Sequence, residues 1–286
     1  MKIGPYPINM PVLLAPMAGI TDLPFRQAVR RFGVGMTVAE MVSARADLQD
    51  SRKHRQRRIS LEEPLPRAIQ IVGNDPREMA SAAALNADLG AGLIDINMGC
   101  PAKKVCRKAA GSALLGDPQQ VRSILQAVVA AVDVPVSLKI RTGLTREQNN
   151  ALEIARIAEG EGIQSLAIHG RSRACLFSGE AEYASIRQVK TVVDIPVVAN
   201  GDINDPLQAK RVLEYTGADA VMIGRAAQGQ PWLPAMIGRY LENGNPSALE
   251  KPALETQKQV CLEHRKQLHR YYGPKMGVKI ARKHIR

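Results

Sequence analysis

Aromatic residues are scarce in this sequence, at 3% of 286 residues, with three phenylalanines and a single tryptophan. Proteins that hold nucleic acid by base stacking need aromatic platforms, so any contact with nucleic acid should depend on shape and phosphate charge instead. No apolar stretch approaches the ~20 residues of a membrane span. The first ten residues, MKIGPYPINM, lack the apolar core of a signal peptide. We therefore expect a cytoplasmic protein.

Cysteine is also sparse, and no two cysteines have the spacing of a known metal or redox motif. The four cysteines, Cys100, Cys106, Cys175 and Cys261, form no C-x-x-C motif, which disfavours a zinc site or a redox dithiol. Cys100 and Cys106 could share a metal ion, but no histidine stands near them in the sequence. We expect no metal, and free thiols in a reducing compartment.

Eight short apolar runs recur along the chain at the spacing of a strand followed by a helix. They are Val12–Ala15, Thr37–Glu40, Ala68–Ile71, Leu93–Asn97, Val136–Ile140, Ser165–His169, Val197–Asn200 and Ala220–Gly224. Several are apolar nearly throughout, as parallel strands buried on both faces should be.

Segments with helical periodicity lie between these runs. They are Glu78–Leu89, Pro118–Val132, Ala151–Glu159 and Pro206–Tyr215. Asp117 and Asp205 directly precede the two prolines and are expected N-caps. Eight alternating strands and helices predict an α/β fold, a (β/α)8 TIM barrel; a doubly wound sheet is the alternative.

The pattern changes after the eighth run. A linker rich in Gly, Asn and Pro at 243–252 precedes a helical, basic segment. We predict a barrel domain over residues 1–245 and the start of a C-terminal helical domain over residues 246–286. The sequence closes with KIARKHIR and no helix stop signal, so we expect this second domain to be truncated.

Charge is unevenly distributed. The net charge is +12, and residues 251–286 hold ten Lys or Arg and two Asp or Glu, a net of +8, which leaves +4 for the first 250 residues. Such a basic block is typical of a surface that binds a polyanion, and the alternative is a solvated helix face. The run SRKHRQRR at 51–58 has the same two interpretations.

Candidate site residues, most of them polar, lie at the ends of the predicted strands, where TIM barrels carry their active sites. In chain order they are Pro16, Met17 and Ala18, then Glu40, Gln70, Asn97, Lys139, Arg141, His169, Arg171, Asn200, Gly201, Asp202, Gly224 and Arg225. The glycines after the seventh and eighth strands suit close approach of a phosphate, although they could simply make turns.

Lys139 lies in an otherwise apolar strand, and a buried lysine is costly unless it has a partner. With Gln70 inside another strand, it suits a planar ring that needs hydrogen bonds at its edge. A flavin fits, because a cation stabilises the reduced ring near N1. No G-x-G-x-x-G motif is present, so we expect no separate nucleotide-binding domain for NADPH.

Cys100 stands in the stretch DINMGCPAKKV, between a predicted strand end and two lysines. A loop thiol near cations can have a lowered pKa and act as a nucleophile. It can also stay protonated and donate a proton at the right moment. The third interpretation is an inert, small apolar side chain.

Taken together, several long motifs resemble the tRNA-dihydrouridine synthase family, in particular its B-type branch. They are APMAGITDLPFR, DINMGCPAKKV, LKIRTG, IHGRSRACLFSGEAEY, VVANGDI, GADAVMIGRAAQGQPW and YYGPKMGVKIARKH. The resemblance covers essentially the whole chain, although family members continue for several helical turns beyond KIARKH.

The resemblance implies an FMN- and NADPH-dependent reduction of a uridine C5–C6 bond in tRNA, at uridine 17 of the D-loop. Cys100 would protonate C5 as the catalytic acid. The residues that would hold FMN are Pro16, Met17, Ala18, Gln70, Lys139, His169, Asn200, Gly201, Asp202, Gly224 and Arg225. Asn97, Arg141 and Arg171 would contact the flipped uracil, and we expect a monomer.

Two other functions remain open from the residues. A flavin dehydrogenase of the dihydroorotate type would share the barrel, the FMN and a loop acid, but the basic tail argues against it. A non-catalytic RNA-binding barrel is the other, and the set of Lys139, Cys100 and Asn200 to Asp202 argues against that.

Overall fold

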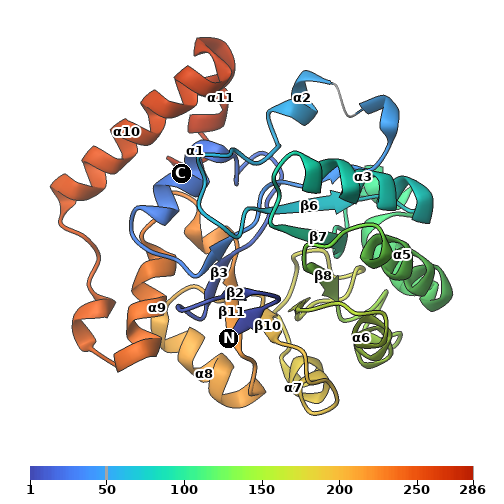
Figure 1. Cartoon of the computed structure of the whole chain (residues 1–286). Coiled ribbons are helices and arrows are strands. Elements are labelled where there is room, and N and C mark those ends of the chain that lie inside the picture. Colours follow the sequence, from blue (N-terminus) through green and yellow to red (C-terminus); the bar gives the residue numbers. More distant parts are fainter. Residues whose placement is uncertain (49–50, 286) are drawn as a thin grey trace.

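The computed structural model describes residues 1–48 and 51–285, and within them parallel strands curl into a barrel surrounded by helices (Figure 1). The strand order is β4-β3-β11-β10-β9-β8-β7-β6-β5, and every neighbouring pair is parallel. The bounds are β3 (Val12–Leu14), β4 (Met36–Thr37), β5 (Val42–Ser43), β6 (Ala68–Val72), β7 (Leu93–Met98), β8 (Val136–Arg141), β9 (Leu166–His169), β10 (Val197–Asn200) and β11 (Ala220–Ile223).

The barrel closes through the segment between β4 and β5. Val38 forms a parallel bridge with Ala68 of β6, and the Ala39 N–H donates to the Ala68 carbonyl oxygen at 2.9 Å. This bridge joins the two ends of the strand order, so the predicted (β/α)8 TIM barrel is confirmed, and the doubly wound alternative is wrong.

The second predicted strand, Thr37–Glu40, differs from the structure. Only Met36–Thr37 pairs with β3, and the strand resumes at Val42–Ser43 beside β6. Glu40 lies between the two pieces with its buried carboxylate 3.3 Å from Arg57 and hydrogen-bonded to the Gly19 N–H. A buried charge must be paired, and Arg57 and the Gly19 N–H supply the partners of this carboxylate.

Helices follow the strands and cover the barrel. They are α1 (Leu23–Arg30), α2 (Arg52–Arg55), α3 (Pro76–Asp88), α4 (Lys103–Cys106), α5 (Pro118–Ala130), α6 (Ala151–Gly160), α7 (Ala184–Lys190) and α8 (Pro206–Thr216), with short 3-10 turns at η1 (Ala46–Leu48), η2 (Gly111–Gly116) and η3 (Arg225–Ala227). Asp117 and Asp205 accept from the third residue beyond them, Gln120 N–H at 3.0 Å and Gln208 N–H at 2.8 Å. Both predicted N-caps are therefore confirmed.

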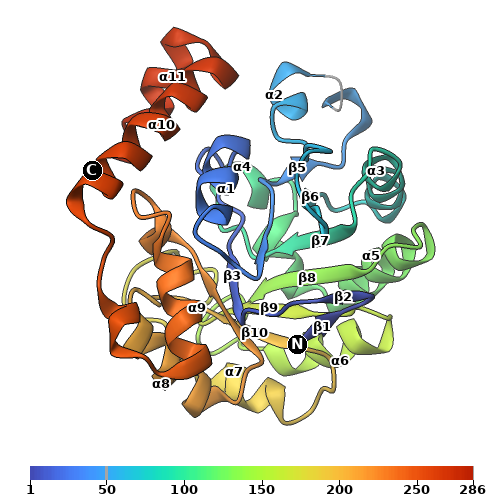
Figure 2. The ribbon, with the colours of Figure 1, turned by 60° about the vertical axis from the view of Figure 1, so that its left-hand side comes forward.

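A short N-terminal hairpin, β1 (Lys2–Ile3) and β2 (Tyr6–Pro7), completes one end of the barrel core (Figure 2). Ile3 and Ile8 are fully buried and join the apolar cluster that the inward-facing side chains of the strands form, including Leu13 and Val198. Because this end is packed with apolar groups, the opposite end, where the strands finish, is left to carry polar side chains.

The C-terminal region is helical. It consists of α9 (Leu233–Asn243), η4 (Pro246–Leu249), α10 (Leu254–Tyr272) and α11 (Pro274–Ala281). In both ribbon views α10 and α11 form an arm at the side of the barrel. The arm packs on α1, where the ring of Phe25 lies 5.5 Å from that of His264 and 4.7 Å from that of His284. The boundary at residue 245 stays a prediction.

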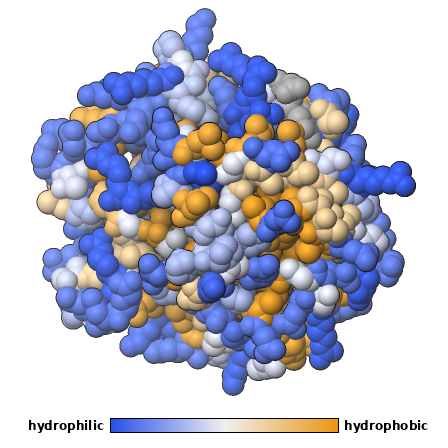
Figure 3. Space-filling view, viewed as in Figure 1, coloured by the Kyte–Doolittle hydropathy of each residue, from blue (hydrophilic) through white to orange (hydrophobic). Residues whose placement is uncertain are grey.

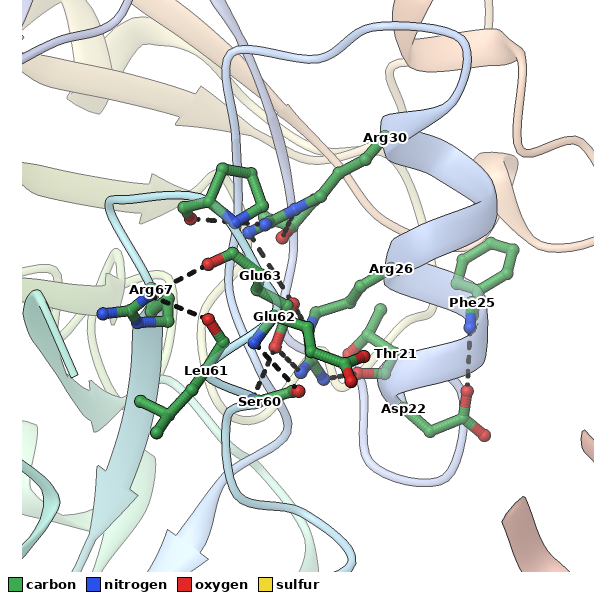
Figure 4. Close-up of polar contacts among 12 residues, drawn as sticks. Thr21, Asp22, Phe25, Arg26, Arg30, Ser60, Leu61, Glu62, Glu63 and Arg67 are labelled. Atoms are coloured by element: carbon green, nitrogen blue, oxygen red, sulfur yellow. Dashed lines mark hydrogen bonds and ion pairs between the residues drawn. The ribbon is translucent and has the colours of Figure 1, made fainter. Parts of the chain in front are cut away.

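A buried ion pair fixes α1 to the segment that follows the basic run (Figure 4). Arg26 donates from Nε and Nη2 to the two carboxylate oxygens of Glu63 at 2.8 and 2.6 Å. Glu63 also accepts from the Ser60 N–H at 3.0 Å. Burial opposes the charge on Glu63, but Arg26 outweighs it and holds the pKa of that carboxyl below its usual value.

The surface in Figure 3 is hydrophilic over most of the face shown, with hydrophobic side chains gathered in patches near its middle. Among the residues that the structure describes, no helix combines the length and apolar character needed to cross a bilayer.

Candidate active site

A cavity of about 560 Å³ opens where the barrel strands end. It is lined by residues from the ends of β3, β6, β7, β8, β9, β10 and β11 and from the loops that follow them. The predicted site residues on its wall are Pro16, Met17, Ala18, Gln70, Asn97, Cys100, Lys139, Arg141, His169, Asn200, Gly201, Asp202, Gly224 and Arg225. Parallel strands in a barrel bring their carboxyl ends together, and of the residues expected to act or to hold FMN or uracil, Arg171 alone lies outside this lining.

Lys139 in β8 faces the cavity and is only 9% exposed. Its ammonium donates to Asn200 Oδ1 at 2.9 Å, and Asn200 Nδ2 donates in turn to the Met222 carbonyl oxygen at 2.8 Å. Burial, followed by the nearby charge of Arg141, lowers the pKa of Lys139 to about 8. At neutral pH this side chain is therefore mainly a cation held in a fixed position.

Gln70 and Asn97 form one hydrogen-bonded chain with Asp95. Gln70 Nε2 donates to Asp95 Oδ2, and Asn97 Nδ2 donates to Gln70 Oε1, each at 2.7 Å. Ser137 Oγ donates to the other oxygen of Asp95 at 2.6 Å. Asp95 was missed from the sequence, although a charged residue inside an apolar strand is the same signal that indicated Lys139.

The loop of Cys100 is held from both sides. Asn97 Oδ1 accepts from the N–H groups of Gly99 at 3.2 Å and Cys100 at 3.0 Å. Arg141 Nε donates to the Gly99 carbonyl oxygen at 2.9 Å. Burial raises the pKa of the Cys100 thiol above its ordinary value. The thiol is therefore protonated at neutral pH, which favours a proton donor over a nucleophile.

His169 is neutral at this site. Burial, and then the positive charges of Lys139, Arg141 and Arg171, lower the pKa of His169 to about 2. Its Nε2 lies 3.3 Å from Nη1 of Arg171, so the guanidinium donates and Nε2 accepts. The imidazole can thus offer its other nitrogen as a neutral hydrogen-bond donor.

Arg171 forms a two-point ion pair with Asp202. Its Nη1 and Nη2 lie 2.8 and 2.6 Å from the two carboxylate oxygens, and Nε donates to the Ser178 carbonyl oxygen at 3.3 Å. The side chain is buried. Arg225 reaches the same carboxylate at 3.3 Å. The predicted uracil contact of Arg171 stays a prediction, and the observed contacts make it a support for the loop after β10.

Glycine suits the positions after β10 and after β11 for two different physical reasons. Gly201 has a φ of +125°, and a Cβ there would lie 2.7 Å from the Cβ of Ala181, so backbone conformation and packing both require glycine. At Gly224 a Cβ would meet nothing closer than Ala15 and Met17 at 3.9 Å. It would instead stand in the cavity, which suits close approach of a ligand to the backbone.

Phe177 was not predicted and lies at the cavity. The residue is 52% exposed, and the guanidinium carbons of Arg225 and Arg141 lie 4.8 and 5.3 Å from its ring centroid. Arg141 also holds the same loop by donating to the Leu176 carbonyl oxygen at 2.7 Å. The sequence did contain a signal for Phe177, because it is one of only three phenylalanines and follows a predicted barrel strand.

The basic surfaces lie beside this end of the barrel. In the run 51–58, Arg57 pairs with Glu40 and donates to the Met41 carbonyl oxygen at 3.1 Å, which ties the run to the cavity wall; the side chain of Lys53 lies outside the described residues. Lys283, just after α11, donates to the Gly19 carbonyl oxygen at 3.1 Å. The exposed cations of the arm include Arg265, Lys266, Arg270, Lys275, Lys279 and Arg282.

Comparison with known proteins gives consistent results. A family model described as dihydrouridine synthase matches residues 13–286. The chain is 56% identical over 285 residues to tRNA-dihydrouridine synthase B of Escherichia coli, covering 100% of this chain and 88% of that protein. It is also 56% identical over 287 residues to tRNA-dihydrouridine synthase B of Pseudomonas syringae pv. tomato, covering 100% and 84%.

Solved structures with lower identity share the fold. Histamine dehydrogenase from Rhizobium sp. 4-9 superposes with a TM-score of 0.63 at 14% identity, covering 88% of this chain and 48% of that one. A 2-naphthoyl-CoA reductase gives a TM-score of 0.63 at 12% identity, covering 88% and 52%.

Proposed function

The chain belongs to the dihydrouridine synthase family, and on that premise we propose that it reduces the C5–C6 double bond of a D-loop uridine in tRNA, at uridine 17, with FMN as cofactor and NADPH as electron donor. The observation that carries the proposal is that a protonated thiol, Cys100, and a buried cation, Lys139, face one cavity.

The cavity suits a flavin. Pockets for small ligands commonly span about 300–1,000 Å³, and this one has about 560 Å³. Lys139, set by Asn200, offers a cation to the ring edge, and Gln70 offers a buried amide. Gly224 leaves room beside the backbone, and Arg225 adds a charge for a phosphate. These residues would hold FMN.

The chemistry follows from the substrate. Uracil is an α,β-unsaturated carbonyl, so its C5–C6 bond is reduced by a hydride at C6 and a proton at C5. Reduced FMN, when bound, supplies the hydride. Cys100 holds the proton for C5, and the raised pKa of its thiol keeps that proton in place until it is needed. Asn97 and Arg141 fix the loop that presents this thiol.

The base must leave the folded tRNA to reach the cavity, at a cost of a few kcal/mol. Phosphate contacts to the arm and to the run 51–58 would offset this cost, because both carry exposed cations beside the cavity end of the barrel. Aromatic platforms are few, so shape and charge would guide this binding.

The test is to incubate the protein, FMN and NADPH with tRNA from a strain that lacks these enzymes, and to map dihydrouridine by mass spectrometry. Dihydrouridine at uridine 17 alone supports the proposal, and another single position corrects the site. Turnover of dihydroorotate without tRNA would favour a small-molecule dehydrogenase instead. A protein that neither binds flavin nor oxidises NADPH would contradict both enzymes.

A further inference from the structure

Asp95 is a buried carboxylate that the proposed chemistry does not use. It lies in the middle of β7 and is 3% exposed. Its two oxygens accept from Ser137 Oγ at 2.6 Å and Gln70 Nε2 at 2.7 Å. Burying a charge is costly unless it is hydrogen-bonded, and a neutral apolar residue would fill this strand position without that cost. The carboxylate instead supplies two acceptor oxygens that an apolar side chain would lack.

The hydrogen bonds give Gln70 and Asn97 one orientation each. An ionised carboxylate only accepts, so Gln70 must turn its Nε2 to Asp95 and its Oε1 to Asn97. Asn97 must then turn Nδ2 to Gln70, which leaves its Oδ1 for the N–H groups of Gly99 and Cys100. A reversed Gln70 would set oxygen against oxygen at Asp95 and donor against donor at Asn97.

We propose that Asp95 is a positioning residue that acts through Gln70 and Asn97 to hold the Cys100 thiol in place. The chain of bonds runs from a strand position to the cavity edge predicted to meet the flavin, and on to the loop of the proton donor. This inference rests on the proposed function for its meaning in catalysis, but the bonds themselves belong to the fold.

Charge at Asp95 also bears on its neighbours. Burial raises the pKa of Asp95 to about 6, with the bonds from Ser137 and Gln70 acting in the opposite direction. The carboxyl group is therefore ionised above pH 6 and able to accept both bonds. Lys139 lies in the neighbouring strand β8. The negative charge of Asp95 raises the pKa of Lys139, whereas burial lowers it.

The first test separates the two half-reactions. Asp95→Leu removes both acceptor oxygens. Asp95→Asn has nearly the volume of aspartate and keeps an acceptor for Gln70 while its Nδ2 donates to Ser137, whose hydroxyl can turn to accept. We expect reoxidation of reduced flavin by tRNA to fall on the order of 10- to 100-fold in Asp95→Leu, the size of effect of a misplaced catalytic group. Flavin reduction by NADPH, which does not use Cys100, should stay within a factor of a few, and Asp95→Asn should resemble the wild type in both.

Equal losses in both half-reactions of Asp95→Leu would overturn the proposal, because they would place the effect at the flavin alone. An equal loss in Asp95→Asn and Asp95→Leu would also overturn it, because charge and not the bond would then matter. If the wild-type protein does not reduce tRNA, the proposed function fails, and the second measurement still tests the positioning.

The second measurement needs neither flavin nor tRNA. Alkylation of Cys100 by iodoacetamide is followed by mass spectrometry of its peptide in the wild type, Asp95→Asn and Asp95→Ala, the last chosen because it cannot overpack the strand. A loop released from Asn97 should react several-fold faster in Asp95→Ala, with Cys175 and Cys261 as internal references. An unchanged Cys100 rate in folded Asp95→Ala would refute the positioning role.

Discussion

Replacing Cys100 by alanine is the most direct test of the proton donor. The thiol lines the cavity, and burial raises its pKa. Even at the ordinary pKa of ~8.5, about nine-tenths of the thiol is protonated at pH 7.5, and the raised value increases that fraction. Nearly every molecule of the wild type therefore carries the proton, and Cys100→Ala removes a fully occupied donor.

The size of the loss follows from general acid catalysis. A positioned acid typically contributes about 10²–10⁴-fold to the rate, which is ~2.7–5.4 kcal/mol of barrier at 1.36 kcal/mol per factor of ten. The hydrogen bonds of Lys139 and Gln70 do not involve the thiol, so flavin content should be unchanged. The assay is single-turnover reoxidation of reduced flavin by tRNA in a stopped-flow instrument.

Cys106→Ala is the matched control. Cys106 ends α4, its thiol lies 3.5 Å from the Cys100 carbonyl oxygen, and it is not part of the cavity lining. Its rate should stay within about threefold of the wild type, equivalent to ~0.65 kcal/mol. The wild-type rate should also fall as pH rises through the raised thiol pKa, and Cys100→Ala should lack that dependence. A Cys100→Ala protein that reoxidises at the wild-type rate would refute the assignment of the acid.

Three further changes test other parts of the structure. Lys139→Ala should weaken flavin retention roughly ten- to a hundredfold, the value of one hydrogen bond from a charged donor, seen in the ratio of flavin to protein absorbance; wild-type retention and rate would contradict the role. Lys275, Lys279 and Arg282 are all exposed. Replacing them with neutral residues should reduce the slope of log Kd for tRNA against log salt by roughly 0.7–0.9 for each phosphate that they neutralise in the wild type. An unchanged slope would show that tRNA binds to another surface. Glu63→Gln should cost about 3–5 kcal/mol of unfolding free energy at pH 7, because it leaves Arg26 buried without its counter-charge. The fold lowers the pKa of Glu63, so the stability that its charge contributes is fully present above the unfolded-state pKa of ~4.3. That stability is lost as pH falls through the pKa of Glu63 in the folded state. Urea unfolding should therefore show a smaller difference between Glu63→Gln and the wild type at acid pH than at pH 7.

Most of the architecture could be predicted because it depends on local patterns. Apolar runs with strand length, helical periodicity between them, and aspartates before prolines are each encoded within a few residues, and Asp117 and Asp205 cap their helices as expected. The position of the cavity followed from the fold, since parallel barrel strands bring their last residues together at one end. Lys139 and Asn200 could therefore be assigned to one site although 61 residues separate them.

The tertiary structure decided what depends on partners distant in sequence. The strand expected at Thr37–Glu40 ends at Thr37, and Glu40 beyond it pairs with Arg57. Arg171 pairs with Asp202 and lies outside the cavity lining. The lysines beside Cys100 in sequence suggested a lowered pKa, yet burial prevails and raises it. Local sequence carries the pattern of exposure along a strand or helix, but the balance of desolvation against charge at a buried group is fixed only when the whole barrel has closed around it.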